Sequence, residues 1–447
     1  MDHRTPLVRL AVPNYVALLS GVLTGIVDVA WVARLGPAPV AAVAVATGVE
    51  NALLGIVLLI NGGVTVRLAA AHGAGDGAAA RSVIRAGWLL YTLITPVVVL
   101  AGLALRHPLA DAFLDDPAAA RLAAGYLAVL FPGVAIFYAQ QVVDGIFAGH
   151  GDTRTPMRLA LTANALILIL DPLLIYGPGP LPALGITGAA LATTAGRAVA
   201  LVIGLVLRHR AAGGGARKNP AVGAVLRTGA PIAGDFLVRM SGALALLAVV
   251  GRSGVAAVAA YGIGLKVLYF ATMAFYALRN AATIHAPRTL AVHPDQRPAI
   301  GRQVLTLALA AGAAASAVFA LLAPLIMRAF TAEREVTTIG VLFLRCVGGY
   351  LTPIAGVIAL AGFLMAAGRG PALFAVTVTG TATQTVLAWW LSARLDLPGV
   401  WLAMCLAALL QLLLVLRLGR LFPGIRAFPQ RHVVHSRLTR PRDFSPH

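Results

Sequence analysis

The stretch LALTANALILILDPLLIYG, residues 159–177, carries one charged side chain, Asp171. About 20 apolar residues are enough for a helix to cross the hydrocarbon core of a bilayer. A second stretch, LAVPNYVALLSGVLTGIVDVAWVA at residues 10–33, also carries a single charge, Asp28. A carboxylate at membrane depth costs roughly 2.5–3.5 kcal/mol on insertion scales, so such a residue usually faces a cavity, finds a partner or takes up a proton.

The composition extends this interpretation to the whole chain. Of its 447 residues, 59% are hydrophobic and 11% are charged, whereas a soluble globular protein carries about 25% charged residues. We therefore expect an all-α polytopic membrane protein, and the first apolar segment is too long for a signal peptide. The net charge of +19 comes mainly from Arg in short loops and the tail, which fits the positive-inside rule and argues against nucleic-acid binding.

Twelve apolar segments are long enough to be membrane spans. They cover approximately residues 7–33, 45–72, 81–105, 119–148, 157–177, 184–207, 222–250, 256–287, 300–327, 336–366, 371–393 and 398–419. The stretch HRAAGGGARKNP at 209–220 divides them six and six. We expect an N-terminal six-helix lobe (1–207), a cytoplasmic linker (208–221), a C-terminal six-helix lobe (222–421) and a disordered basic cytoplasmic tail (422–447).

The distribution of basic residues predicts the orientation. With the N-terminus inside, the inner segments hold 22 Lys and Arg and the outer loops hold seven, so both termini are expected in the cytoplasm. The preference for Arg over Lys and the many Ala residues suggest a GC-rich bacterial genome, hence a multi-pass protein of the bacterial inner membrane. The string PALGITGAALA (182–192) resembles LPGVWLAMCLA (397–407), which predicts two pseudo-symmetric lobes related by an axis along the membrane normal.

Five strings in the first half carry a family resemblance. They are GIVDVAWVARLG (25–36), HGAGDGAAAR (72–81), GHGDTRTPM (149–157), LDPLLIYG (170–177) and LGITGAALAT (184–193). In their order and spacing the chain resembles the multidrug and toxic compound extrusion (MATE) family, and the second half fits by span count and by AYGIGLK (260–266). An acid in both the first and the fifth span resembles the DinF-like subgroup. The resemblance implies a secondary-active multidrug efflux antiporter, whose lobes form a V around a central cavity and alternate between outward and inward openings.

Asp28 and Asp171 are the candidate residues for proton or cation coupling. A carboxyl group in an apolar cavity holds its proton more tightly, because desolvation disfavours the charged form. A cationic substrate favours the ionised form, so proton and substrate compete for one charge, which is sufficient for antiport. The alternative is structural: a buried Asp could pair with an Arg or cap a broken helix, and Asp171, which precedes Pro172, could cap or kink its helix.

The resemblance adds a supporting polar network of Gln141, Thr193 and, less closely, Tyr126. The Asn that the family carries one turn before the fifth-span Asp is Ile167 here. Asn164 lies two turns before that Asp on nearly the same face and could replace it. Hydroxyl and amide groups inside spans also serve simply as contacts between helices.

Two further acids have competing interpretations. Asp235 and Arg239 are four residues apart in the seventh span, which predicts an intrahelical ion pair; a cation or proton site in the second lobe is the alternative. Asp144, near the cytoplasmic end of the fourth span, could join the cavity or pair at the interface with Arg154.

Two other functions compete with antiport. A flippase for a lipid-linked precursor would line its cavity with several Arg. An intramembrane enzyme such as a prenyltransferase would need a metal site, but the only acidic doublet, Asp115-Asp116, lies in an outer loop and the sequence holds no HExxH or GxSxG string.

No Gly-x-x-x-x-Gly-Lys-Ser/Thr loop occurs, so ATP is not the direct energy source. We expect a monomeric, cofactor-free and metal-free transporter of small organic molecules that uses protons, with sodium the less favoured coupling ion.

Overall fold

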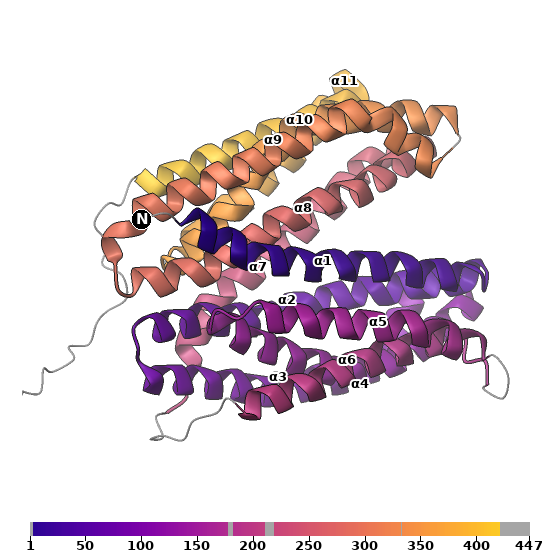
Figure 1. Ribbon diagram of the computed structural model, residues 1–447. Coiled ribbons are helices and arrows are strands. Elements are labelled where there is room, and N and C mark those ends of the chain that lie inside the picture. Colours follow the sequence, from indigo (N-terminus) through magenta and orange to yellow (C-terminus); the bar gives the residue numbers. More distant parts are fainter. Residues whose placement is uncertain (1–2, 178–181, 211–218, 332, 421–447) are drawn as a thin grey trace, which may run out of the picture.

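The computed structural model describes residues 3–177, 182–210, 219–331 and 333–420, and the regular elements within these ranges are all helices. Most of the predicted linker and the predicted tail lie outside them. The helices, shown in Figure 1, are α1 Arg4–Ala33, α2 Pro37–Gly73, α3 Gly77–Phe113, α4 Pro117–Gly149, α5 Arg154–Tyr176, α6 Ile186–Arg210, α7 Val222–Gly251, α8 Val255–Leu290, the short 3-10 helix η1 Pro294–Gln296, α9 Arg297–Phe330, α10 Arg334–Ala366 and α11 Gly370–Arg420.

Helix α11 is two membrane spans joined without a loop. It has 51 residues, more than twice the length that one span needs. The backbone of Asp396 leaves the helical region (φ 52°, ψ −139°), and Pro398 follows it. The break falls between the predicted segments 371–393 and 398–419. Counting α11 as two, the eleven apolar helices found in the described residues give the expected twelve spans.

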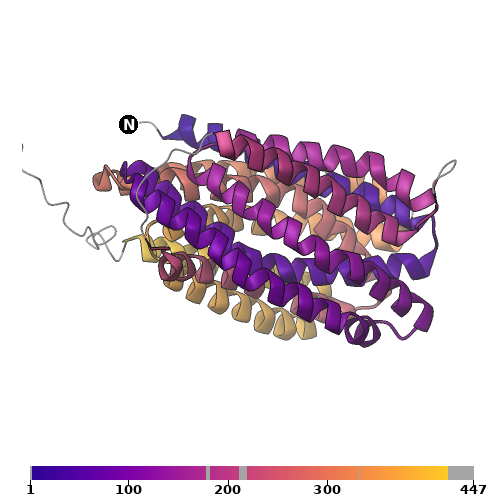
Figure 2. The ribbon, with the colours of Figure 1, turned by 90° about the horizontal axis from the view of Figure 1, so that it is seen from below.

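The helices form two layers (Figure 1). We call α1–α6 the N-lobe and α7–α11 the C-lobe; seen from below, the N-lobe helices lie in front of the C-lobe (Figure 2). In the N-lobe, α4 packs against α2, α3 and α6, and α5 packs against α6 and α1. In the C-lobe, α8, α9 and α11 surround α10, whose residues 353–366 are all buried. That segment carries no charge, and a helix that is apolar all round belongs in the interior.

Acids in the loop motifs act as helix caps. The carboxylate of Asp76 accepts the backbone N–H groups of Ala78 and Ala79 at the start of α3. Asp116 does the same at the start of α4, and Asp152 accepts the N–H of Arg154 at the start of α5. A side-chain oxygen at this position satisfies backbone donors that have no partner inside the helix. These three acids therefore define helix starts.

A repeated junction relates the two lobes. Gly185 precedes α6 with φ 57°, and Asp396 precedes the second half of α11 with φ 52°. In each lobe a glycine follows three residues later, Gly188 after Gly185 and Gly399 after Asp396. A Cβ on either glycine would overlap the end of the preceding span. The structure thus pairs Gly185 with Asp396 and Gly188 with Gly399. The sequence comparison paired 182–192 with 397–407, a register that differs by about one helical turn. The two registers differ because apolar helices resemble one another in several alignments.

Close backbone contacts join the lobes at one end. A Cβ on Gly229 of α7 would overlap the carbonyl oxygen of Leu59 in α2, and a Cβ on Gly73 would overlap that of Arg288 in α8. Small residues allow helices in lipid to approach this closely. The contacts fall on the second half of α2, the first half of α7 and the last turns of α8, which all lie at the end where α1 begins. The lobes are therefore in contact at the predicted cytoplasmic end.

Candidate functional site

Two hydrogen bonds fix the register of α1 against α5. The amide of Asn164 donates to the Ser20 hydroxyl (2.8 Å), and the Tyr176 hydroxyl donates to the Trp31 carbonyl (2.6 Å). The residue numbers of these pairs differ by 144 and 145. Those of the two candidate acids, 28 and 171, differ by almost the same amount. The acids therefore lie at the same depth on neighbouring parallel helices, each five residues before its helix ends.

Both acids have buried carboxylate oxygens without hydrogen-bonding partners among the described residues. Asp171 is fully buried, and neither of its carboxylate oxygens has a partner. Asp28 is half-buried, and its Oδ1 atom is buried without a partner. A buried acceptor left in this state costs free energy when it is charged. A capping role for Asp171 is not seen, since α5 continues through Pro172 to Tyr176 and neither carboxylate oxygen has a hydrogen-bonding partner among the described residues.

A small cavity lies among α2, α4 and α6 of the same lobe. It holds about 20 Å³, room for about one water molecule. Its polar lining consists of Glu50, Tyr126, Thr193, Thr194 and Arg197. Asp28 and Asp171 do not line it, but both lie within electrostatic range of the buried Tyr126 hydroxyl.

An ion pair that we did not predict crosses this cavity. The Arg197 guanidinium lies 2.7 Å from the Glu50 carboxylate, with each side chain 30% exposed, and it also stacks over the Phe137 ring at 4.6 Å from its centroid. Glu50 is the only acid in the second span. It is the single charged residue between Arg34 and Arg67, so a search for acids isolated in apolar sequence, applied to that stretch, would have found it too.

The other predicted polar groups have different neighbours. Gln141 accepts from the amide of Asn61 through both its side chain (2.9 Å) and its backbone carbonyl (2.8 Å), and Asn164 bonds to α1 as described above. Asp144 accepts a hydrogen bond from Gln140 (2.9 Å). Among the described residues, Asp171 thus receives no hydrogen bond from the expected network. The amides of Asn61 and Asn164 join helices to one another, whereas that of Gln140 bonds within α4.

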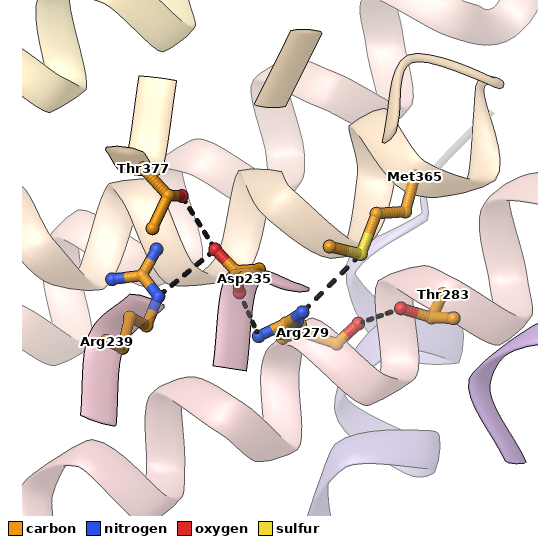
Figure 3. A network of polar contacts seen from close by, with 6 residues as sticks. All are labelled: Asp235, Arg239, Arg279, Thr283, Met365 and Thr377. Carbon is orange, nitrogen blue, oxygen red and sulfur yellow. Dashed lines mark hydrogen bonds and ion pairs between the residues drawn. The ribbon is translucent and has the colours of Figure 1, made fainter. Parts of the chain in front are cut away.

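The C-lobe holds a second buried charge cluster, shown in Figure 3. Asp235 of α7 is fully buried and lies 3.2 Å from the Nε atom of Arg239, which confirms the predicted intrahelical ion pair. Arg279 of α8 approaches the other carboxylate oxygen at 3.1 Å, and the Thr377 hydroxyl of α11 donates at 2.6 Å. Arg279 also contacts the Met365 sulfur at 3.4 Å.

This cluster has more positive than negative charge, because one carboxylate faces two guanidinium groups. The Nη2 atom of Arg239 is buried and has no hydrogen-bond acceptor among the described residues. Arg279 and Thr377 come from other helices, so the spacing that predicted the Asp235–Arg239 pair could not reveal them. The excess of positive charge does not favour a cation at this position.

Comparisons with known proteins agree with this architecture. The chain is 27% identical over 207 residues to the FAD transporter of Shewanella oneidensis, covering 46% of each chain. It is 27% identical over 291 residues to the probable multidrug resistance protein NorM of Thermotoga maritima, covering 63% of this chain and 62% of that one. The aligned regions thus span about half to three fifths of these relatives.

A solved structure has the same fold over nearly the full length. An outward-facing multidrug resistance MATE family transporter of the MOP superfamily superposes with a TM-score of 0.86 at 22% identity, covering 94% of this chain and 96% of that one. The MatE family model matches twice, over residues 13–173 and 231–390, as expected for two related lobes. Because these matches cover well over half of its residues, the chain belongs to the MatE family.

Proposed function

We propose that this protein is a secondary-active efflux transporter that exchanges protons for amphipathic cations at Asp28 and Asp171. The single observation that carries the proposal is the register of α1 and α5, which puts two carboxyl groups, each with a buried oxygen that lacks a partner among the described residues, at one depth. Two carboxylates at one depth on helices that pack together, in an apolar setting, do not both ionise without cost. A proton or a cationic substrate relieves the same repulsion, so each displaces the other.

Alternating access supplies the second requirement of antiport. The lobes are in contact at the end where α1 begins, through Gly229 and Gly73, so this conformation is closed toward the predicted cytoplasm. Protons from the outside then reach the acidic pair, with the cavity beside Tyr126 as a place for a water molecule. Opening toward the cytoplasm releases the proton and admits the substrate. Members of the family are transporters and not enzymes, so the prenyltransferase alternative is set aside.

The experiment is uptake of a fluorescent cation into inverted vesicles that contain the full-length protein, with Asp171→Asn as the test variant. An imposed pH gradient, acid inside, should drive uptake by the wild-type protein and not by the variant. Asp111→Asn, at an exposed position near the end of α3, is the matched control and should behave as wild type. Proton-driven uptake by Asp171→Asn at the wild-type rate would remove this residue from the mechanism, and uptake driven only by a sodium gradient would reverse the choice of ion.

A second candidate, export of anionic compounds, is favoured by the C-lobe cluster. There one guanidinium nitrogen of Arg239 is buried without an acceptor and the local charge is positive. The Shewanella oneidensis relative is named an FAD transporter, and a lipid-linked precursor flippase would also carry an anion. Uptake of FAD by the same vesicles, lost in Arg239→Gln, would support this candidate; absence of FAD uptake by the wild-type protein would argue against it.

A further inference from the structure

A second cavity lies between the lobes at the end of the bundle where α1 begins. Its volume is about 810 Å³, within the range of about 300–1,000 Å³ typical of ligand pockets. Four parts of the chain line it: the first turns of α1, the end of α2, the loop from α4 into α5, and the end of α8. It is separate from the acidic pair, which lies near the opposite ends of α1 and α5.

The lining of this cavity is strongly basic. Its titratable nitrogen-bearing side chains are Arg9, His72, Arg154, His285, Arg288 and His293. Asp152 is the only acid among the described residues of the lining. The Asp152 carboxylate is already engaged. It accepts hydrogen bonds from the backbone N–H groups of Arg154 (2.9 Å) and Thr155 (3.0 Å) and from the Thr155 hydroxyl (2.5 Å). Three guanidinium groups therefore share one cavity with a single carboxylate that caps a helix.

Arg288 connects the two lobes across this cavity. Its guanidinium lies over Gly151 of the N-lobe, where a Cβ would overlap the Nη1 atom, and its carbonyl lies against Gly73. Gly151 also has φ 84°, a conformation that other residues rarely adopt. On α8, His285 neighbours both Arg288 and Thr289, since residues three and four apart lie next to each other on a helix. The geometry thus presents a cationic C-lobe face to an N-lobe loop.

Like charges gathered in a cavity repel one another, and an anion relieves this repulsion. Guanidinium groups match phosphate oxygens through pairs of parallel hydrogen bonds. The Thr289 hydroxyl adds a neutral donor at the same lining. Basic pockets between transmembrane helices on the cytoplasmic side are also a recurring type of lipid headgroup site.

We propose that this cavity binds a phosphate group, supplied by the headgroup of an anionic phospholipid or by free phosphate in the cytoplasm. The phosphate contacts Arg9 and Arg154 from the N-lobe and Arg288 from the C-lobe. Because these residues belong to both lobes, the ligand favours the conformation in which this end is closed. The site is distinct from the proposed transport site and does not depend on the transported substrate.

The test uses full-length protein purified in phosphate-free detergent. Equilibrium dialysis with radiolabelled inorganic phosphate measures binding directly. Thermal unfolding is measured in vesicles of phosphatidylcholine alone and with added phosphatidylglycerol. The variants are Arg288→Gln and Arg9→Gln, and the matched control is Arg302→Gln, an exposed residue near the start of α9 that is not part of the lining.

Saturable phosphate binding by the wild-type protein, weakened at least tenfold in Arg288→Gln and Arg9→Gln and unchanged in Arg302→Gln, supports a site for free phosphate. Stabilisation by phosphatidylglycerol that the same two variants lose supports a site for the headgroup. Arg9 is exposed, so its variant keeps the test valid where Arg288→Gln does not fold. Failure of the wild-type protein to respond to either probe, or equal responses from wild type and both test variants, overturns the proposal.

Discussion

The Oδ2 atom of Asp235 lies 3.1 Å from the guanidinium of Arg279, which joins α7 to α8 at a fully buried carboxylate. The same carboxylate holds Arg239 and Thr377, so three helices of the C-lobe meet on one side chain. Such a cluster is not strong evidence of net stabilisation, since desolvation offsets much of the attraction between buried charges. Removal of one member has a much clearer effect.

Asp235→Asn should therefore destabilise the protein strongly. The substitution leaves two guanidinium groups buried without a counter-charge, and breaking a buried pair costs about 3–5 kcal/mol. Thermal unfolding in detergent measures the change, with Asp295→Asn in the exposed helix η1 as the control. A variant as stable as wild type would mean that the cluster does not hold the three helices together.

Asp28→Asn and Asp171→Asn should have non-additive effects on transport. If the two acids act as one proton site, each single variant lowers proton-driven uptake at least tenfold and the double variant is no worse, as for other residues that act as a unit. Uptake of a fluorescent cation into inverted vesicles measures all three. Effects that multiply in the double variant would indicate two independent sites.

The Glu50–Arg197 pair should contribute little to stability. Each side chain is 30% exposed, and pairs in contact with solvent are typically worth about 0.2–1 kcal/mol. A double-mutant cycle with Glu50→Gln and Arg197→Gln, read by thermal unfolding, measures the coupling energy. A coupling well above this range would show that the pair is shielded inside the lobe.

Gly229→Ala should weaken the contact between the lobes. Its Cβ would overlap the Leu59 carbonyl oxygen in α2, and overpacking of this kind typically costs about 1–3 kcal/mol. Gly223→Ala on the same helix is the matched control, because a Cβ there meets nothing within 4 Å. Thermal unfolding compares the two variants. Equal melting temperatures would indicate that α2 and α7 accommodate the added methyl group without loss of stability.

Periodicity and composition predicted the helical class and the span count, because a bilayer requires about 20 apolar residues per crossing and the chain meets that requirement twelve times. The break inside α11 was also predicted, since Pro398 and the polar residues before it interrupt an apolar run. The i, i+4 spacing predicted the Asp235–Arg239 pair for the same reason: both partners lie on one helix, so their distance is fixed locally.

Contacts between helices were not accessible in this way. Sequence spacing does not show that Arg279 and Thr377 meet Asp235, that Glu50 meets Arg197, or that Gln141 pairs with Asn61. Apolar helices resemble one another in several registers, so the amino-acid sequence does not define which helix faces are in contact. The sequence alone determined that Asp28 and Asp171 each lie in an apolar span. Only the packing of α1 against α5 decided that they lie at one depth, because that register depends on two hydrogen bonds between residues more than 140 positions apart.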